Sequence, residues 1–190
     1  MNDSKLIIFA RPPVLGTVKQ RLASQVGPEK ALQVYTRLLN HTLQVAEDCG
    51  VSFTLYSTNP YHNFTPNYKI QSGKNLGERM FNAIKSELDT ETSTQVCLIG
   101  SDTAEINAEI LKISFSSLLQ NDLVIGPAKD GGYYLIGMKK AYPELFVNID
   151  WSTPKVLEQT LTKANHLVLK SHLLQELSDV DTVEDLPIGW

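Results

Sequence analysis

Residues 96–102 read Val96-Cys97-Leu98-Ile99-Gly100-Ser101-Asp102. An unbroken apolar run of this length predicts a strand, Gln95–Ile99, that is buried on both faces and ends at the glycine. Strands of that kind belong to parallel sheets with helices on both sides. The run also brings the Asp102 carboxylate to the strand's carboxyl end, which is the edge at which such sheets bind ligands.

Strand and helix patterns alternate on both sides of this run. Further strands are expected at Lys5–Ala10, Val51–Ser57, Tyr68–Gln71, Leu123–Ile125, Tyr133–Met138 and Leu167–Lys170. Helices are expected at Pro28–Cys49, Leu76–Leu88 and Thr153–Asn165, and from an Asn107 cap to about Leu119; the polar stretch Thr58–Asn67 is expected to be a loop. The alternation predicts an α/β fold with a mostly parallel sheet covered on both faces. Residues 1–190 contain no linker or repeat, so a single domain is expected.

The overall charge and the cysteines exclude several classes of protein. A formal net charge of -4 without a long Lys or Arg run argues against a nucleic-acid partner, but leaves room for a local cationic pocket. Cys49 and Cys97 are far apart and form no CxxC, so neither a disulfide framework nor a thiolate metal site is expected. The opening apolar stretch, Lys5–Ala10, is too short for a signal peptide or a membrane span, so we expect a cytoplasmic protein.

The loop after the first strand, Arg11–Leu22, combines prolines, a glycine and cations. Gly16 permits a tight turn before a helix, whose first free N–H groups would suit a phosphate. Arg11, Lys19 and Arg21 add three positive charges around that point. A solvated basic helix start is an equally open interpretation. The loop is neither a P-loop nor a GxGxxG motif, which disfavours ATPases and nicotinamide enzymes.

Two further strand ends carry candidate residues. Asp102 can ligate Mg²⁺ or Mn²⁺, which prefer carboxylate oxygens, or it can cap the turn that follows. The turn Asp130-Gly131-Gly132 is a hairpin signal, although paired glycines also let a backbone approach a sugar or a phosphate. Tyr133 and Tyr134 should point to opposite faces, which leaves only one of them for the core.

The last motif is acidic. Asp179 and Asp181 stand two apart, so in an extended segment they share a face and could meet a cation together. Asp181 or Thr182 can also cap a short helix that carries Glu184 and Asp185 in its first turn, and this explains the acids structurally. Both interpretations stay open.

Taken in order, these motifs resemble a bacterial family of GT-A-type, glycosyltransferase-like transferases of the radical-SAM/selenodomain-associated type, related in fold to the nucleotidyltransferases that make molybdenum and deazaflavin cofactors. The resemblance spans Lys5–Leu186. The matching residues are Phe9-Ala10-Arg11, Pro13, Gly16, Val18-Lys19, Arg21-Leu22, Gln71, Gly73, Leu76-Gly77-Glu78-Arg79-Met80, Gly100-Ser101-Asp102, Gly126-Pro127-Ala128, Asp130-Gly131-Gly132-Tyr133-Tyr134-Leu135-Ile136-Gly137, Trp151-Ser152-Thr153-Pro154 and Asp179-Val180-Asp181-Thr182. It implies the three-layer α/β/α, Rossmann-like GT-A fold of nucleotide-diphospho-sugar transferases.

The resemblance also implies a metal-dependent transferase that acts on a nucleotide-diphosphate donor, first of all a nucleotide sugar, and on an unspecified acceptor. Lys19 and Arg21 would contact the pyrophosphate, with Arg11 nearby. Asp102 would hold Mg²⁺ or Mn²⁺ as a Lewis acid, with Asp181 as a second ligand.

Other residues receive roles from the same resemblance. In the turn Asp130-Gly131-Gly132, the aspartate would be the base for an attacking hydroxyl, with a hairpin role as the alternative, and the glycines would approach the donor. Glu78 and Arg79 would face the nucleotide, or pair with each other at the surface. Trp151 and Thr153 would line the acceptor side, with an ordinary core role for Trp151 as the alternative.

Two alternative functions stay open. One is a nucleotidyltransferase that releases pyrophosphate, although Arg11–Leu22 lacks the glycine-rich loop with an Arg-Met pair that is usual in sugar nucleotidyltransferases. The other is a degenerate nucleotide-binding protein. This alternative is motivated by the segment Thr103-Ala104-Glu105, which stands where the family has a cysteine or small residue and then a proline. The loss of that proline is expected to loosen the loop beside Asp102. Further departures are Leu15, Gln20 and Asn75, where proline, threonine and aspartate are usual.

Overall fold

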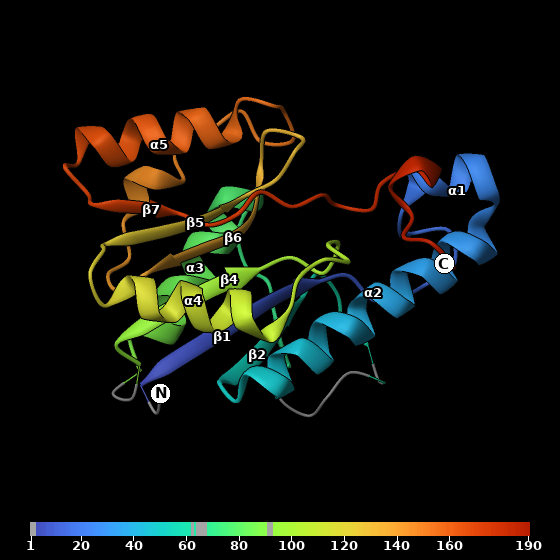
Figure 1. Ribbon diagram of the computed structural model, residues 1–190, viewed down its shortest axis with the longest axis horizontal. Helices are drawn as coiled ribbons and strands as arrows, with labels where there is room; N and C mark the ends of the chain where they lie inside the picture. Colours follow the sequence, from blue (N-terminus) through green and yellow to red (C-terminus); the bar gives the residue numbers. More distant parts are fainter. Residues whose placement is uncertain (1–2, 62, 64–67, 91–92) are drawn as a thin grey trace.

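A computed structural model describes residues 3–61, 63, 68–90 and 93–190, and shows a seven-stranded sheet between layers of helices (Figure 1). The strands are β1 (Ser4–Ala10), β2 (Ser52–Ser57), β3 (Tyr68–Ile70), β4 (Gln95–Ile99), β5 (Leu123–Pro127), β6 (Tyr133–Met138) and β7 (Ser171–Leu173). They lie in the order β3-β2-β1-β4-β6-β5-β7. β6 is antiparallel to both of its neighbours, and the other pairs are parallel. The expected α/β fold with a mostly parallel sheet is confirmed.

A reversal in the strand order determines where a ligand can bind. β1 pairs with β2 on one side, with Ile8 opposite Leu55, and with β4 on the other side, with Ile8 opposite Ile99. The chain extends the sheet through β2 and β3 in one direction and then returns to place β4 in the other. The loops that leave β1 and β4 therefore diverge at their carboxyl ends, where open α/β sheets form a ligand-binding crevice.

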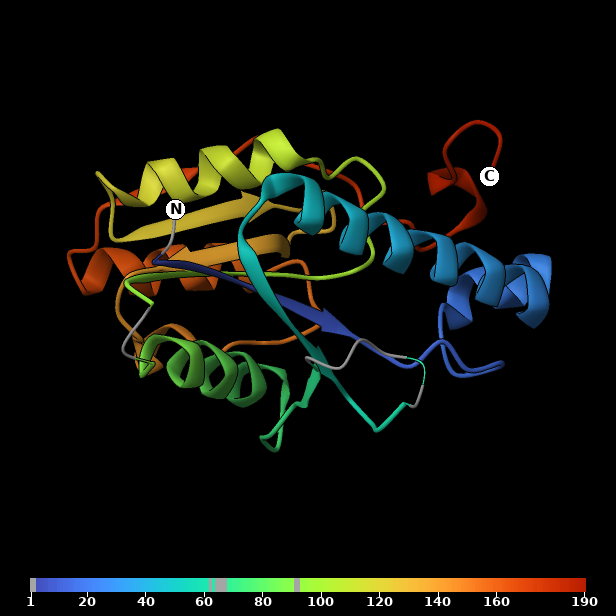
Figure 2. The same cartoon turned by 90° about the horizontal axis from the view of Figure 1, so that it is seen from below.

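Helices cover both faces of the sheet (Figure 2). Helices α2 (Pro28–Cys49) and α4 (Ala108–Leu118) cover one face, and α3 (Leu76–Leu88) and α5 (Val156–His166) cover the other. Successive residues of a strand enter opposite cores, so the unbroken apolar runs of β1 and β4 are buried on both faces. The shorter α1 (Gln20–Val26) packs on α2 beyond the carboxyl edge, and the 3-10 turns are η1 (Pro143–Leu145) and η2 (Val183–Asp185).

Only one of the two tyrosines of β6, Tyr134, is a buried core residue, as expected, although Tyr133 is also partly buried. Tyr134 is 4% exposed and packs in the core beneath α2 and α4, whereas Tyr133 packs against the core beneath α3 and α5. The two side chains do point to opposite faces, but each face of this sheet is covered. Alternation along a strand separates core from surface only when one face meets water.

The prediction of a last strand at Leu167–Lys170 is wrong. Helix α5 begins at Val156 instead of Thr153 and continues to His166, and the Leu167 N–H donates to the Lys163 carbonyl, which closes a further turn. Leu167 and Leu169 pack against the core from this turn, and the strand β7 starts only at Ser171. Apolar residues in a helix-ending turn and in a short buried strand give the same local pattern.

The remaining helices agree with their local signals. Helices α2 and α3 have the expected bounds, and the Asn107 side chain caps α4 by accepting from the Ile110 N–H at 3.0 Å. The loop expected at Thr58–Asn67 lies partly outside the described residues, which omit 62 and 64–67. Across the described part of the chain, none of the helices combines the length and the apolar character needed to cross a membrane.

Candidate functional site

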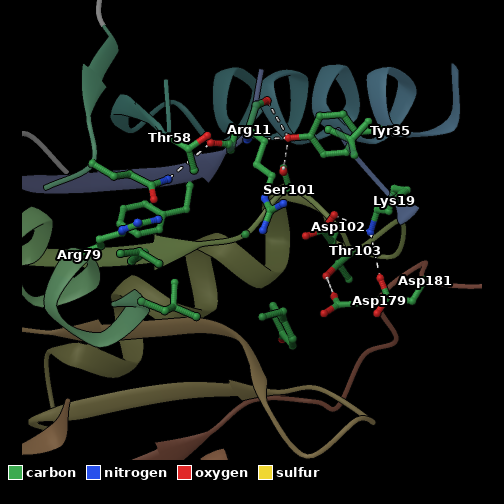
Figure 3. Close-up of a pocket in the computed structure, with 18 of the residues that line it drawn as sticks. Arg11, Lys19, Tyr35, Thr58, Arg79, Ser101, Asp102, Thr103, Asp179 and Asp181 are labelled. Atoms are coloured by element: carbon green, nitrogen blue, oxygen red, sulfur yellow. Dashed lines mark hydrogen bonds and ion pairs between the residues drawn. The ribbon is translucent and has the colours of Figure 1, made fainter. Parts of the chain in front are cut away.

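A cavity of about 540 Å³ opens at the carboxyl edge of the sheet, in the crevice between β1 and β4 (Figure 3). Its walls come from the β1–α1 loop, the loop after β4, the first turns of α3, and residues 177–182, which we call the C-terminal segment. Residues far apart in the sequence therefore meet in one place. Lys19 and Asp102, to which the family resemblance assigns the pyrophosphate and the metal, lie in this same cavity.

An ion cluster occupies one end of the cavity. The Lys19 ammonium lies 2.5 Å from Asp102 Oδ1 and 3.3 Å from Asp181 Oδ1, and Arg21 Nη1 lies 3.4 Å from Asp181 Oδ2. The Lys19 side chain is only 5% exposed, whereas the two carboxylates remain 45% and 44% exposed. One buried cation is thus shared by two carboxylates that remain accessible from the cavity.

Backbone contacts hold the C-terminal segment against the loop after β4. The Val180 N–H donates to the Asp102 carbonyl at 2.9 Å, and Thr103 forms an isolated antiparallel bridge with Asp179. The Ser178 N–H donates to Glu105 Oε2 at 3.2 Å. Thr103 and Glu105 therefore fasten the loop that was expected to be loosened by the absence of the proline.

Asp179 adds a third carboxylate beside the ion pair. Burial raises the pKa of Asp179 to about 6, and the negative charges of Asp102 and Asp130 act in the same direction, against the hydrogen bond that Thr103 Oγ1 donates. The sequence paired Asp179 with Asp181 only as neighbours in an extended segment. The burial of Asp179 involves its contact with Thr103, which is distant in the sequence, so the local spacing of the acids does not predict it.

The buried Tyr35 hydroxyl joins the two loops at the reversal of strand order. It accepts from the Arg11 N–H at 2.8 Å, donates to the Arg11 carbonyl at 2.9 Å, and lies 3.4 Å from Ser101 Oγ. Burial raises the pKa of the Tyr35 hydroxyl, which stays a neutral donor. Tyr35 lies in the helix expected at Pro28–Cys49, but nothing in the helical spacing predicts that its hydroxyl would bridge two loops.

The opposite end of the cavity is formed near α3. Arg79 lines it and donates from Nε to the Gly73 carbonyl at 3.2 Å, which leaves its terminal nitrogens for a ligand. Gln71 also lines this end, and its amide nitrogen donates to the Tyr56 carbonyl at 2.9 Å. Gln71 belonged to the family pattern, but it was not among the expected site residues.

Glu78 is held by the helix cap and does not line the cavity. Its carboxylate accepts from the Lys74 N–H at 2.8 Å, while its own N–H donates to Asn75 Oδ1 at 2.9 Å. Asn75 therefore caps α3 although it replaces the usual aspartate. Glu78 does not form an ion pair with Arg79 among the described residues.

The turn between β5 and β6 also lies outside the cavity lining. The hairpin is present, and exposed Asp130 accepts from the Gly132 N–H at 2.8 Å. Gly131 has φ +87°, and an added Cβ would lie 2.2 Å from the Pro154 carbonyl oxygen. This glycine is therefore required by the close approach of the segment that leads into α5.

Trp151 and Thr153 have structural contacts of their own. The Trp151 indole packs so closely on α3 that a Cβ on Gly77 would lie 2.7 Å from its ring, and it meets Tyr133 edge-on. Thr153 Oγ1 donates to the Asp150 carbonyl at 2.7 Å. Neither residue lines the cavity, and neither does Gly16, at the tip of the first loop.

The carboxylates suit a metal only in partnership with another ligand. Asp102 and Asp181 offer oxygen atoms, the donors that Mg²⁺ and Mn²⁺ prefer. Among the described residues, however, His, Cys, Asp and Glu side chains do not form any group of three that could hold an ion. The donor set fits an ion that is completed by water and phosphate oxygens, which is how Mg²⁺ commonly binds beside nucleotides.

The comparison with known families decides the relationship. A family model described as "Uncharacterized protein conserved in bacteria (DUF2064)" matches residues 32–153. This chain belongs to the DUF2064 family. The crystal structure of a protein from Desulfovibrio desulfuricans, provisionally named a nucleotide-diphospho-sugar transferase, superimposes on the DUF2064 chain with a TM-score of 0.90 at 31% identity, and covers 96% of this chain and 84% of that one. The expected family resemblance and fold are confirmed.

More distant structures share the fold of the DUF2064 chain. The inositol-1-phosphate CTP transferase from T. maritima has a TM-score of 0.66 at 17% identity, and covers 99% of this chain and 93% of that one. The Rv0371c protein of Mycobacterium tuberculosis, in complex with manganese, has a TM-score of 0.59 at 12% identity, and covers 97% and 95% of the two chains. At these identities the likeness shows the fold alone.

Proposed function

We propose that this DUF2064 protein is a transferase that binds a nucleotide-diphosphate donor in the cavity between β1 and β4 and transfers a glycosyl group from it. The observation that carries the proposal is the pair of carboxylates, Asp102 and Asp181, around the Lys19 ammonium at the reversal of strand order. Cations beside half-exposed carboxylates suit a phosphate chain and a divalent ion together. The provisional name of the Desulfovibrio desulfuricans relative supports a nucleotide sugar as donor.

In this proposal the cations of the first loop bind the donor phosphates. Lys19 and Arg21 contact the pyrophosphate, and Arg11, which lines the cavity, binds beside them. Charge-assisted contacts of this kind are the stronger hydrogen bonds in proteins. Arg79, at the far end of the cavity, faces the remainder of the nucleotide.

Asp102 and Asp181 would hold the divalent ion, which the manganese complex of a fold relative makes a reasonable probe. A bound Mg²⁺ or Mn²⁺ supplies a Lewis acid that neutralises charge on the departing diphosphate. Lys19 shares this task, because its ammonium is held within reach of the same position. The Tyr35 tether keeps the two contributing loops at a fixed separation.

Two roles stay proposals on weaker support. Asp130 is proposed as the base for an attacking hydroxyl, since its negative charge acts on Asp179, which lines the cavity. Its bond to Gly132 supports the hairpin alternative. For Trp151, the packing against Gly77 favours the core alternative over the acceptor side.

The proposal is tested by calorimetric titration of UDP, GDP, CDP and ADP in the presence of Mn²⁺, followed by assays of nucleotide-sugar hydrolysis with the nucleotide that binds. Binding of one diphosphate, lost in Asp102→Asn, is the expected result. Absence of binding by every diphosphate would remove the proposal. Tight binding without turnover of any donor would identify a nucleotide-binding protein that has lost its reaction.

A nucleotidyltransferase is the second candidate, favoured by the fold shared over nearly the full length with the T. maritima CTP transferase. Such an enzyme takes a nucleoside triphosphate and releases pyrophosphate, whereas a glycosyltransferase releases the nucleoside diphosphate. Measurement of pyrophosphate release from the four triphosphates separates the two. Pyrophosphate release would reassign the donor without moving the site.

A further inference from the structure

We propose that Lys19 is a placeholder cation: its ammonium occupies the position between Asp102 and Asp181 in the free protein, so that a divalent ion is admitted only together with the nucleotide diphosphate. This inference rests on the proposed function and concerns the order in which the same site is filled. It assigns to Lys19 a role in excluding the metal as well as in binding phosphate.

The contacts of Lys19 satisfy both carboxylates at once. Its Nζ lies 2.5 Å from Asp102 Oδ1 and 3.3 Å from Asp181 Oδ1, and its side chain is 5% exposed. The two carboxylates come from the loop after β4 and from the C-terminal segment, and Lys19 is the cation that both contact. An ion bound between them would have to share that position with the ammonium.

Electrostatics disfavour the metal as long as the ammonium stays. Two carboxylates carry two negative charges, and Lys19 already offsets one of them, with Arg21 3.4 Å from Asp181 offsetting more. A divalent ion in the same position would be repelled by both cations at short range in a partly buried site, where screening by water is reduced. The third carboxylate of the cavity, Asp179, already accepts a hydrogen bond from Thr103 Oγ1, and His, Cys, Asp and Glu side chains of the described residues form no group of three that could hold an ion.

A nucleotide diphosphate changes this balance. Its phosphate oxygens offer the flexible lysine side chain a new anionic partner, and they also complete the oxygen shell of a divalent ion. The ammonium can then turn from the carboxylates to the phosphate while the metal takes its former position. Metal and nucleotide should accordingly bind with strong mutual dependence.

The test measures Mn²⁺ binding without nucleotide, from the loss of the free-ion electron paramagnetic resonance signal. The variant is Lys19→Met, which keeps the length of the side chain and removes its charge. Lys139→Met is the matched control, because exposed Lys139 follows β6 at the opposite edge of the sheet. Thermal unfolding followed by circular dichroism verifies that each variant is folded, and Lys19→Gln replaces Lys19→Met if the latter does not fold.

Wild type and Lys139→Met should bind Mn²⁺ weakly, and Lys19→Met should bind it about tenfold more tightly or better. Adding Asp102→Asn to Lys19→Met should abolish the gain. The inference is overturned if folded Lys19→Met binds Mn²⁺ no more tightly than the control, or if a diphosphate that binds to the wild type leaves its affinity for Mn²⁺ unchanged. A wild type that binds no diphosphate of the panel removes the proposed function, and with it the coupling to nucleotide, even where the gain in Lys19→Met is seen.

Discussion

Lys19 combines an unusual backbone with a buried charge. Its φ of 48° and ψ of 50° lie in the left-handed region, which side chains other than glycine adopt at a cost. The structure maintains this conformation because the ammonium is fixed by Asp102 and Asp181 on two other segments. Helix α1, which begins at the next residue, has only seven residues, so side-chain charge carries more of the expected phosphate binding than the helix end does.

Replacing Lys19 with alanine should weaken the binding of a nucleotide diphosphate in the presence of Mn²⁺. A charge-assisted phosphate contact contributes about 1.5–3 kcal/mol, so the dissociation constant should rise by roughly ten- to 150-fold. Calorimetry on Lys19→Ala and on Lys139→Ala checks this. Equal losses in the two variants would show a general charge effect in place of a contact.

Gly131 should tolerate no side chain. Its φ of +87° strains any other residue, and an added Cβ would lie 2.2 Å from the Pro154 carbonyl oxygen. Gly131→Ala should therefore lower the free energy of unfolding by about 3 kcal/mol. Gly50 is the matched control, because its φ is +73° with open space around the position, so Gly50→Ala should cost only about 1 kcal/mol. Urea denaturation of both variants compares them, and similar losses would exclude the clash as the cause.

At the scale of residues, charge and glycine signals were visible in the sequence, whereas burial was not. Arg11 and Asp102 closely follow strands and Lys19 lies at the end of the loop that leaves the first strand, so the expected edge of the sheet brings them together. The burial of Asp179 and the role of the Tyr35 hydroxyl involve contacts with Thr103 and Ser101, which lie far from them in the chain. No local pattern contains such a contact.

At the scale of elements, the loops after β1 and β4 behave as one unit because Tyr35 on α2 contacts both. Its hydroxyl meets both backbone groups of Arg11 and the Ser101 side chain. A helix that covers one face of the sheet thereby sets the width of the crevice at the sheet's edge. The tether connects packing of the core to the geometry of the cavity.

Tyr35→Phe should release this tether. The Arg11 N–H and carbonyl lose their partner, which should lower the free energy of unfolding by about 1–2 kcal/mol, and binding of a nucleotide diphosphate should weaken as the loops separate. Chemical denaturation and calorimetry measure the two effects. Tyr142→Phe, outside the cavity, controls for the loss of a phenol. Unchanged binding in a destabilised Tyr35→Phe would limit the hydroxyl to a role in stability.

Elements with clear end signals were predicted well from the sequence. The end of α2 at Gly50, in the left-handed region, and the start of α4 at the Asn107 cap are each encoded by a single residue. The strand expected at Leu167–Lys170 is absent because the chain turns there, with φ 56° at Val168, while Leu167 and Leu169 pack against the core. Tertiary contacts determine the conformation of that segment, so its local sequence does not predict it.

At the scale of the molecule, the core between the sheet and helices α2 and α4 buries both cysteines. Cys97 is 0% exposed, and burial raises the pKa of its thiol to about 12; burial also raises the pKa of Cys49. Because the thiolate is the reactive form, neither cysteine should react with a disulfide reagent at neutral pH in the native protein, and both should react in concentrated urea. Counting released thiolate by absorbance checks this, and a thiol that reacts in the native protein would contradict the packing.

The position of the C-terminal segment in the chain affects when the site can form during biosynthesis. Synthesis proceeds from the first residue, so all seven strands precede Asp181 on the nascent chain. A chain that has just finished its sheet still lacks the second acidic partner of Lys19 and the fastening at Val180. Competence to handle substrate is therefore acquired late in biogenesis, after the scaffold has already formed.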